Sequence, residues 1–343
     1  MADVSINAIL KALRHKTYEV EYCKKLWANA KAELEYCKND FANTLAELEY
    51  YKNLWGSTQV QLEYLKEHVD ITTLKPATGK LRQDQLALVD VCSDFFEEIK
   101  ELSVKPFLIA GNLLGAVRHQ GFIPWDEDLD FGLMREDYTK LVNFCKKKYI
   151  VTDYTKNYKK SEWNCDIGYS QLRPYLKDYP NQYILDIWMD QIQIFFGTSL
   201  ADRRAIDFWV YDYYDENYTF EDHKKYLDYI SKKKDEIDNI ADIIDFLDEE
   251  VKSNKNIVKK SNNIFFGIDC VMSYSKPFNN SFIPYDVIFP LKKMKYEHAE
   301  FYAPNKDMEY LLYEFQDPMK FPNDLGIGHH HLLRDKFISE YGL

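Results

Sequence analysis

Four acidic residues within five positions, at the start of an apolar segment, are the strongest chemical signal in the sequence. They are Asp126, Glu127, Asp128 and Asp130. If residues 128–133 form a strand, Asp128 and Asp130 point to the same face, about 6.6 Å apart along the backbone. Two carboxylates at that distance repel each other by roughly 2.5 kcal/mol at an effective dielectric constant near 20. A divalent cation between them would turn this repulsion into binding.

The type of ligand restricts the metal. Carboxylate oxygens are hard ligands, which favour Mg²⁺ (or Mn²⁺) over zinc. The sequence therefore predicts a magnesium or manganese site held by Asp126, Asp128 and Asp130. A solvated acidic turn is the alternative interpretation, but the flanking Trp125 and Phe131 favour carboxylates anchored on a packed element.

A glycine turn precedes these acids. Residues 107–110 form a short apolar run typical of a buried strand, Gly111 ends it, and residues 112–118 are expected to enter a short helix. Such a turn presents backbone N–H groups to an anion, and glycine lets the backbone approach a phosphate closely. Before these elements, residues 85–102 have helical spacing and are expected to open the catalytic domain.

The stretch from Phe107 to Tyr138, FLIAGNLLGAVRHQGFIPWDEDLDFGLMREDY, resembles the signature of the LicD family. That family includes bacterial phosphocholine transferases and, more distantly, fukutin-related proteins, within the nucleotidyltransferase superfamily. The superfamily pattern is a glycine turn, Asp-x-Asp and a third carboxylate on a later strand. Asn112 stands where many relatives have Thr or Ser, and Glu127 where many have Asp. The resemblance resumes at Asp286 and covers most of residues 81–323.

The resemblance implies an α+β fold, a nucleotidyltransferase-like mixed sheet with flanking helices. It also requires a third carboxylate, for which Asp186 is preferred because residues 183–188 resemble the family's Ile-Asp-Ile-Phe strand. An unpaired charge in such an apolar segment would be costly, which favours a functional role. Asp190, Asp207 and Asp269 compete for the same role, with Asp269 the most serious rival.

The family chemistry is attack by a sugar hydroxyl on the phosphorus of a CDP-linked donor, such as CDP-choline or a CDP-alditol, with CMP leaving. The acceptor would be a cell-surface or capsular glycan. The expected catalytic carboxylates are Asp128, Asp130 and Asp186, and the same three together with Asp126 are expected to bind the metal. The donor phosphates would be positioned by Gly111, Asn112 and Arg118. Arg173, Arg203 and Arg204 are further candidates for binding pyrophosphate, although surface ion pairs explain them as well.

Three other functions compete with this one. A nucleotidyltransferase would use an NTP, act on a protein or a small molecule, and release pyrophosphate. A non-catalytic scaffold would recruit glycan-assembly enzymes around an inactive domain, but Asp128 and Asp130 argue against inactivity. A glycosyltransferase with Asp-x-Asp fits the segment from Gly111 to Arg118 poorly.

A repeat of 14 residues, or two heptads, runs through the N-terminal 70 residues. One heptad position is apolar ten times in succession: Ile6, Leu13, Val20, Trp27, Leu34, Phe41, Leu48, Trp55, Leu62 and Val69. This pattern predicts a helical coiled coil about 96 Å long that makes homo-oligomers through residues 6–69. A helical hairpin broken at Gly56-Ser57 is the alternative. We therefore expect a rod at 1–72, a linker at 73–80 and a catalytic domain at 81–343.

Composition narrows the partners and the location. A net charge of −12 argues against nucleic acid, because phosphate contacts need clustered Lys and Arg. The six scattered cysteines are expected to be reduced, and neither a signal peptide nor an apolar run of spanning length is evident. These features predict a cytoplasmic protein, or one at the inner face of the membrane through a peripheral partner. His329-His330-His331 is interpreted as a solvated loop, not as a zinc site.

Overall fold

The chain forms two compact units, Met1–Val69 and Asp70–Leu343. The structure, a computed structural model, describes residues 6–152, 154–162, 165–187, 192–200, 202–274 and 281–321. The division falls three residues before the end of the rod expected from the sequence. Within the described ranges, no helix is both long and apolar enough to cross a lipid bilayer.

The first unit is a single helix, α1, from Ile6 to His68. It continues through Gly56 and Ser57, so the alternative of a helical hairpin is wrong. Its described large apolar side chains at the repeating heptad position are exposed in the single chain, for example Trp27 at 68% and Trp55 at 57%. A helix of 63 residues that leaves such side chains in water has no core of its own.

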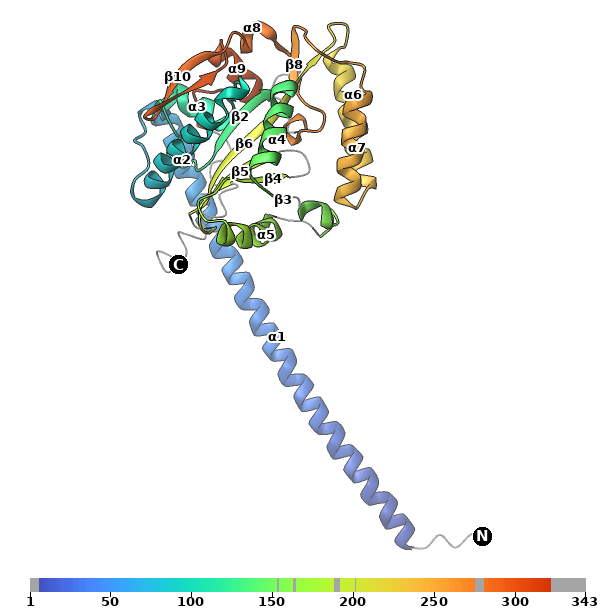
Figure 1. Cartoon of the computed structure of the whole chain (residues 1–343). Helices are drawn as coiled ribbons and strands as arrows, with labels where there is room; N and C mark the ends of the chain where they lie inside the picture. The colour runs from blue at the N-terminus through green and yellow to red at the C-terminus, as the bar shows by residue number, and fades with distance from the viewer. Residues whose placement is uncertain are drawn as a thin grey trace. The chain divides into compact units, whose positions relative to one another are not determined.

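The second unit is built on a mixed sheet whose main path has the order β10-β11-β1-β2-β6-β5-β4-β3 (Figure 1). The strands of this path are Lys292–Tyr296, Ala299–Ala303, Phe107–Leu108, Leu129–Met134, Arg204–Tyr214, Ile192–Phe196, Ile184–Ile187 and Ile150–Thr152, in that order. Off this path lie β7 (Ile257–Val258), β8 (Asn263–Phe266) and β9 (Ile283–Pro284). The pairs β1–β11, β2–β6 and β3–β4 are parallel and the other pairs are antiparallel.

Helices flank this sheet. They are α2 (Gly79–Glu98), α3 (Ala110–His119), α4 (Arg135–Lys148), α5 (Cys165–Asp178), α6 (Phe220–Glu236), α7 (Ile240–Ser253), α8 (Tyr285–Ile288) and α9 (Asp307–Glu314). The described residues also form the short 3-10 turns η1 (Ile71–Thr73), η2 (Lys100–Leu102), η3 (Tyr154–Asn157) and η4 (Val271–Ser273). Figure 1 shows α6 and α7 side by side, away from α2 and α3. The expected mixed sheet with flanking helices is confirmed.

The core forms where β2 and β6 run side by side in the centre of the sheet. Leu129, Phe131 and Leu133 alternate along β2 and are fully buried. Phe131 stacks on Phe208 of β6, with ring centroids 6.0 Å apart. Alternation places the intervening Asp130 on the opposite face of the sheet, so burial of the apolar side chains sets the direction of this carboxylate.

Candidate active site

A row of polar residues crosses five neighbouring strands at one level of the sheet. Asp130 of β2 is the register partner of Asp207 of β6, which pairs with Gln193 of β5. Gln193 pairs with Asp186 of β4, and Asp186 with Thr152 of β3. Adjacent strands are about 4.8 Å apart, so Asp207 lies one strand from Asp130 and Asp186 lies three strands away, roughly 14 Å.

Asp207 therefore takes the place beside the acidic pair. It is buried, and its Oδ1 accepts a hydrogen bond from Nε2 of Gln193 at 2.7 Å. Burial and then the negative charge of Asp128 raise the pKa of Asp207 to about 8, although the Gln193 hydrogen bond and the charge of Arg203 oppose this rise. A carboxyl group in this condition can hold or accept a proton near neutral pH.

Asp130 is oriented by a side chain from the neighbouring strand. Nε1 of Trp209 on β6 donates to Oδ1 of Asp130 at 2.8 Å. Burial raises the pKa of Asp130 well above its usual range, and the negative charges of Asp128 and Asp207 raise it further. The three carboxylates are thus close enough to disfavour one another's ionisation.

Asp126 faces Asp128 and the glycine turn. Burial, the negative charge of Asp128 and a hydrogen bond with the Asp128 side chain raise the pKa of Asp126 well above its usual range. A Cβ added at Gly111 would lie 3.1 Å from Oδ2 of Asp126. The glycine turn and the acidic segment predicted from the sequence are therefore in direct contact.

Buried amides hold the backbone of the acidic segment. Nε2 of Gln85 on α2 donates to the carbonyl oxygen of Asp126 at 2.9 Å. Nδ2 of Asn112 donates to the carbonyl oxygen of Asp128 at 2.8 Å, and Oδ1 of Asn112 accepts the N–H of Asp130. Asn112 is fully buried, so its side chain positions the carboxylates from behind, whereas the sequence predicted a substrate contact.

Arg118 lies at the opposite end of α3 from Gly111. Its guanidinium donates from Nε to the carbonyl oxygen of Pro318 and from a terminal nitrogen to that of Lys320, at 2.8 Å. Burial lowers the pKa of Arg118 to about 10. The guanidinium thus binds the C-terminal segment. The sequence had predicted that it would bind the donor phosphates.

The remaining candidates have other partners or are not described. Asp186 is fully buried and accepts a hydrogen bond from Oγ1 of Thr152. Both oxygens of Asp269 accept hydrogen bonds from Arg135 at 2.6 Å, and Asp212 shares the same guanidinium. Asp190 and the residues 329–331 lie outside the described ranges.

Two side chains that contact the acidic segment, Gln85 and Trp209, had only weak signals in the sequence. Gln85 is a polar residue on the buried face of an amphipathic helix, which is unusual unless its amide has a partner. Trp209 follows Asp207 by two positions and so lies on the same face of β6. Residues 206–209, Ile-Asp-Phe-Trp, have the same apolar setting as residues 184–188, so local sequence could not decide between Asp207 and Asp186.

The carboxylates fit a magnesium ion that a substrate helps to bind. Within the described ranges, no three His, Cys, Asp or Glu side chains form a ready-made metal cage. Mg²⁺ is commonly held by one or two carboxylates together with substrate phosphates and water. Asp126, Asp128, Asp130 and Asp207 supply hard oxygen donors whose mutual repulsion a cation would relieve.

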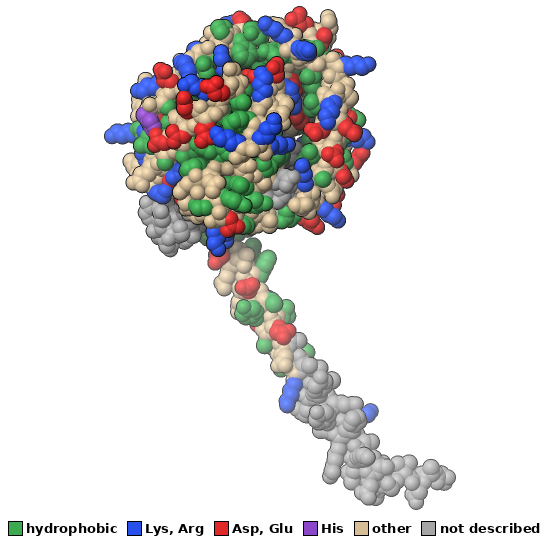
Figure 2. Space-filling view, in the orientation of Figure 1, with side chains coloured by type: hydrophobic (Ala, Val, Ile, Leu, Met, Phe, Trp, Pro, Cys, Tyr) green, Lys and Arg blue, Asp and Glu red, His purple; other side chains and the backbone are tan. Residues whose placement is uncertain are grey.

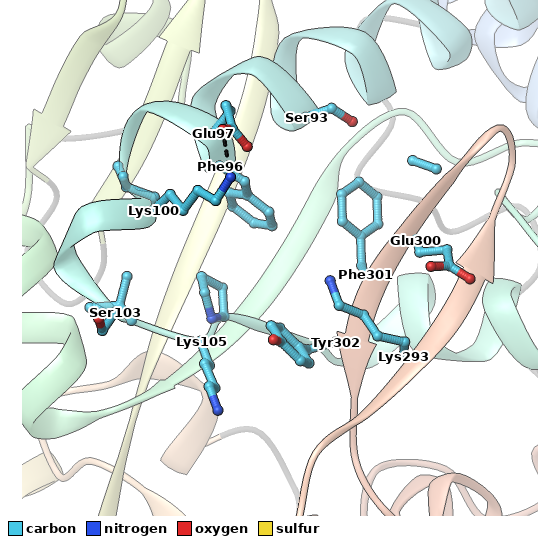
Figure 3. A pocket seen from close by; sticks show the side chains of 14 residues that line it. Ser93, Phe96, Glu97, Lys100, Ser103, Lys105, Lys293, Glu300, Phe301 and Tyr302 are labelled. Carbon is cyan, nitrogen blue, oxygen red and sulfur yellow. Dashed lines mark hydrogen bonds and ion pairs between the residues drawn. The ribbon is translucent and has the colours of Figure 1, made fainter.

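A separate cavity of about 520 Å³ lies where the chain enters β1, at the end of that strand away from Gly111 (Figure 3). Nζ of Lys293 is 4.1 Å from the ring centroid of Tyr302, and Nζ of Lys105 is 5.8 Å from it. None of the acidic residues of the candidate site lines this cavity.

Residues 103–243 match the family model described as LicD/FKTN/FKRP, nucleotidyltransferase domain. A Haemophilus influenzae protein named lipopolysaccharide cholinephosphotransferase LicD is 36% identical over 63 residues, which are 18% of this chain and 24% of that protein. An uncharacterized Rickettsia prowazekii protein is 38% identical over 76 residues, 22% of this chain and 28% of the relative. An uncharacterized Rickettsia typhi protein is 48% identical over 52 residues, 15% and 17% of the two chains. The matched segments thus span about a quarter of these relatives or less.

Proposed function

Because the chain belongs to the LicD family through its domain at residues 103–243, we propose that it transfers a phosphorylated small group to a glycan. The group is of the phosphocholine or phospho-alditol type, the donor is CDP-linked, and the acceptor is a hydroxyl of a cell-surface or capsular glycan. The name of the Haemophilus influenzae relative supports a phosphocholine group. The observation that carries the proposal is the contact between the glycine turn and a cluster of four carboxylates.

In the proposed reaction, the acceptor hydroxyl oxygen forms a bond to the donor phosphorus next to the choline or alditol. The phosphorus–oxygen bond to CMP breaks, and CMP leaves with the bonding electrons. The hydroxyl proton passes to a carboxylate. Bound Mg²⁺ would neutralise negative charge on the phosphates.

The residues of the chain have separate tasks in this scheme. Asp126, Asp128 and Asp130 would hold the metal with the donor phosphates, and the backbone at Gly111 would lie against them. For the third carboxylate we propose Asp207 in place of Asp186, since Asp207 lies beside Asp130. Burial raises its pKa, which suits a group that accepts the acceptor's proton.

The test is a donor panel followed by phosphorus NMR. The full chain would be incubated with Mg²⁺, CDP-choline, CDP-alditols and NTPs, with and without an extract of acceptor glycans. We expect CMP release from one CDP-linked donor, loss of at least about 100-fold in Asp128→Asn, and normal rates in Asp228→Asn, an exposed acid on α6. Pyrophosphate release from an NTP would instead identify a nucleotidyltransferase. No turnover and no metal binding would favour the scaffold function.

A further inference from the structure

The carboxylate of Glu314, the last residue of α9, reaches the N-terminus of α3. Its Oε2 accepts the backbone N–H of Ala110 at 2.8 Å, and its Oε1 accepts the hydroxyl of Tyr310 at 2.8 Å. The Tyr310 hydroxyl is 2.5 Å from that of Tyr211 on β6, and both tyrosines are fully buried. A continuous chain of hydrogen bonds therefore joins the central strand β6 to the first residue of α3.

Ala110 needs such support because its backbone is strained. Its φ of 48° is in the left-handed region, which costs a residue with a Cβ on the order of 1 kcal/mol. The next residue is Gly111, whose Cα hydrogen faces Oδ2 of Asp126. A change in the backbone at Ala110 would therefore move the turn that contacts the acidic cluster.

The same C-terminal segment also holds the other end of α3. Arg118 donates hydrogen bonds to the carbonyl oxygens of Pro318 and Lys320. Helix α3 packs against α9, and Figure 1 shows the two side by side. Residues 314–320 thus form hydrogen bonds with both ends of α3, the helix that carries the glycine turn. These residues lie outside the segment matched by the family model.

We propose that Glu314 is a positioning residue of the transferase site. It acts through Ala110 and holds the glycine turn against Asp126 in the geometry that receives the donor phosphates. This inference rests on the proposed function for its kinetic consequence, but its structural part concerns the turn alone. Glu314 touches neither the donor nor the acceptor in this proposal.

Three variants separate positioning from simple stability. Glu314→Ala removes both hydrogen bonds. Glu314→Gln keeps them, because the amide oxygen can accept from Ala110 and the amide nitrogen can donate to Tyr310. Glu309→Ala is the matched control, an exposed glutamate on the same helix whose ion pair with Lys306 is 3.6 Å long.

Two readouts decide the outcome in the full chain. The first is amide hydrogen exchange by mass spectrometry over residues 107–119, which requires no turnover. The second is kcat and KM for the CDP-linked donor. We expect Glu314→Ala to speed exchange in this segment alone and to raise the donor KM about tenfold, while Glu314→Gln and Glu309→Ala stay within about twofold of the unchanged chain.

Other results would overturn the inference. A folded Glu314→Ala variant with unchanged hydrogen exchange and unchanged KM would overturn it. Faster exchange throughout the second unit would also overturn it, because that result indicates a purely structural role. If Glu314→Ala does not fold, Tyr310→Phe serves in its place, because it removes one hydrogen bond to the carboxylate. It should speed hydrogen exchange over the same residues, but by less. A Tyr310→Phe variant with unchanged exchange would also overturn the inference. Absence of CMP release from the unchanged chain would contradict the proposed function, while the exchange result would still decide the role of Glu314.

Discussion

Asp207 and Asp186 are buried aspartates in similar apolar strands, and their neighbours distinguish them. Asp207 has Asp130 beside it in register and is affected by the charge of Asp128. Asp186 has Gln193 on one side and Thr152 on the other. Of the two aspartates, Asp207 is the one whose strand adjoins the strand of Asp130.

This difference gives a direct prediction for two matched variants. Asp207→Asn should lower kcat at least about 100-fold, because asparagine cannot accept the proton of the acceptor hydroxyl. Asp186→Asn should leave kcat within about threefold and change mainly stability, since Asp186 lies three strands from Asp130 and accepts a hydrogen bond from Thr152. Donor turnover and thermal unfolding of both variants would be measured. The reverse order of activities would restore Asp186 as the third carboxylate.

Glu314 makes stability depend on pH. Burial raises the pKa of Glu314 from 4.5 to about 7, so the folded state favours the protonated form. Its contribution to stability is therefore complete below about pH 4.5 and is lost as the pH rises through 7. The hydroxyls that face it, on Tyr310 and Tyr211, stay neutral in this range because their pKa values are raised well above 10.

We expect the free energy of unfolding of the unchanged chain to fall by about 2 kcal/mol more than that of Glu314→Gln between pH 5 and pH 8. Glutamine does not titrate, so it serves as the reference at the same position. Denaturant unfolding followed by tryptophan fluorescence at several pH values measures the difference. Parallel pH profiles for the two proteins would show that Glu314 does not titrate in this range.

At the scale of elements, the close approach of β1, β2 and β6 depends on a glycine. A Cβ added at Gly132 of β2 would lie 2.7 Å from the ring of Phe107 and 2.8 Å from that of Tyr211. These rings flank the strand that carries Asp130, and the Tyr211 hydroxyl also belongs to the hydrogen-bond chain that ends at Ala110. Packing of the three strands and orientation of the site are therefore coupled.

Gly132→Ala should destabilise the second unit by about 1–3 kcal/mol, because two buried aromatic rings would have to move. Gly56→Ala in α1 is a suitable control, since nothing lies within 4 Å of its added Cβ and alanine favours helix. Denaturant midpoints of both variants test this. Equal midpoints for Gly132→Ala and the unchanged chain would mean that the rings adapt without cost.

At the scale of the whole molecule, the two units differ in how they use apolar residues. The second unit buries them in one large core and two smaller clusters, and acidic and basic side chains are interspersed on the face shown in Figure 2. In the described part of α1, by contrast, one heptad position remains apolar and exposed from Trp27 to Trp55. We propose that a second copy of this helix covers the exposed stripe, as the 14-residue repeat predicts.

The full chain should therefore form an oligomer, with a solution mass at least twice the 40.8 kDa of one chain. Replacing Leu34 and Leu48 by glutamate puts charges into the stripe and should lower the mass to that of the monomer. Exchange of the exposed Glu35 and Glu49 for alanine is the control, since these residues lie at heptad position b, outside the apolar stripe and its flanking e and g positions. Multi-angle light scattering measures the mass of the unchanged chain, of the glutamate variant and of the alanine control. A monomeric unchanged chain would contradict the proposed assembly.

The sequence by itself determined the features that depend on neighbours along the chain. The helix of the first unit, the glycine turn and the strand that presents Asp130 all follow from periodicity and turn residues over short stretches. The apolar residues of β2 must face the core, so the carboxylate between them must face the other way. The acidic segment and the family could therefore be predicted without tertiary structure.

Only the tertiary structure decided which distant residues lie beside the acidic segment. Asp207 reaches Asp130 because β6 pairs with β2 in parallel, a choice that no local pattern records. Gln85, Asn112 and Glu314 acquire their tasks in the same way, through hydrogen bonds to backbone groups brought near by packing. Strand order and register depend on the burial of apolar side chains across the whole sheet. The partner of a buried polar residue therefore cannot be predicted until the strands around it have been placed.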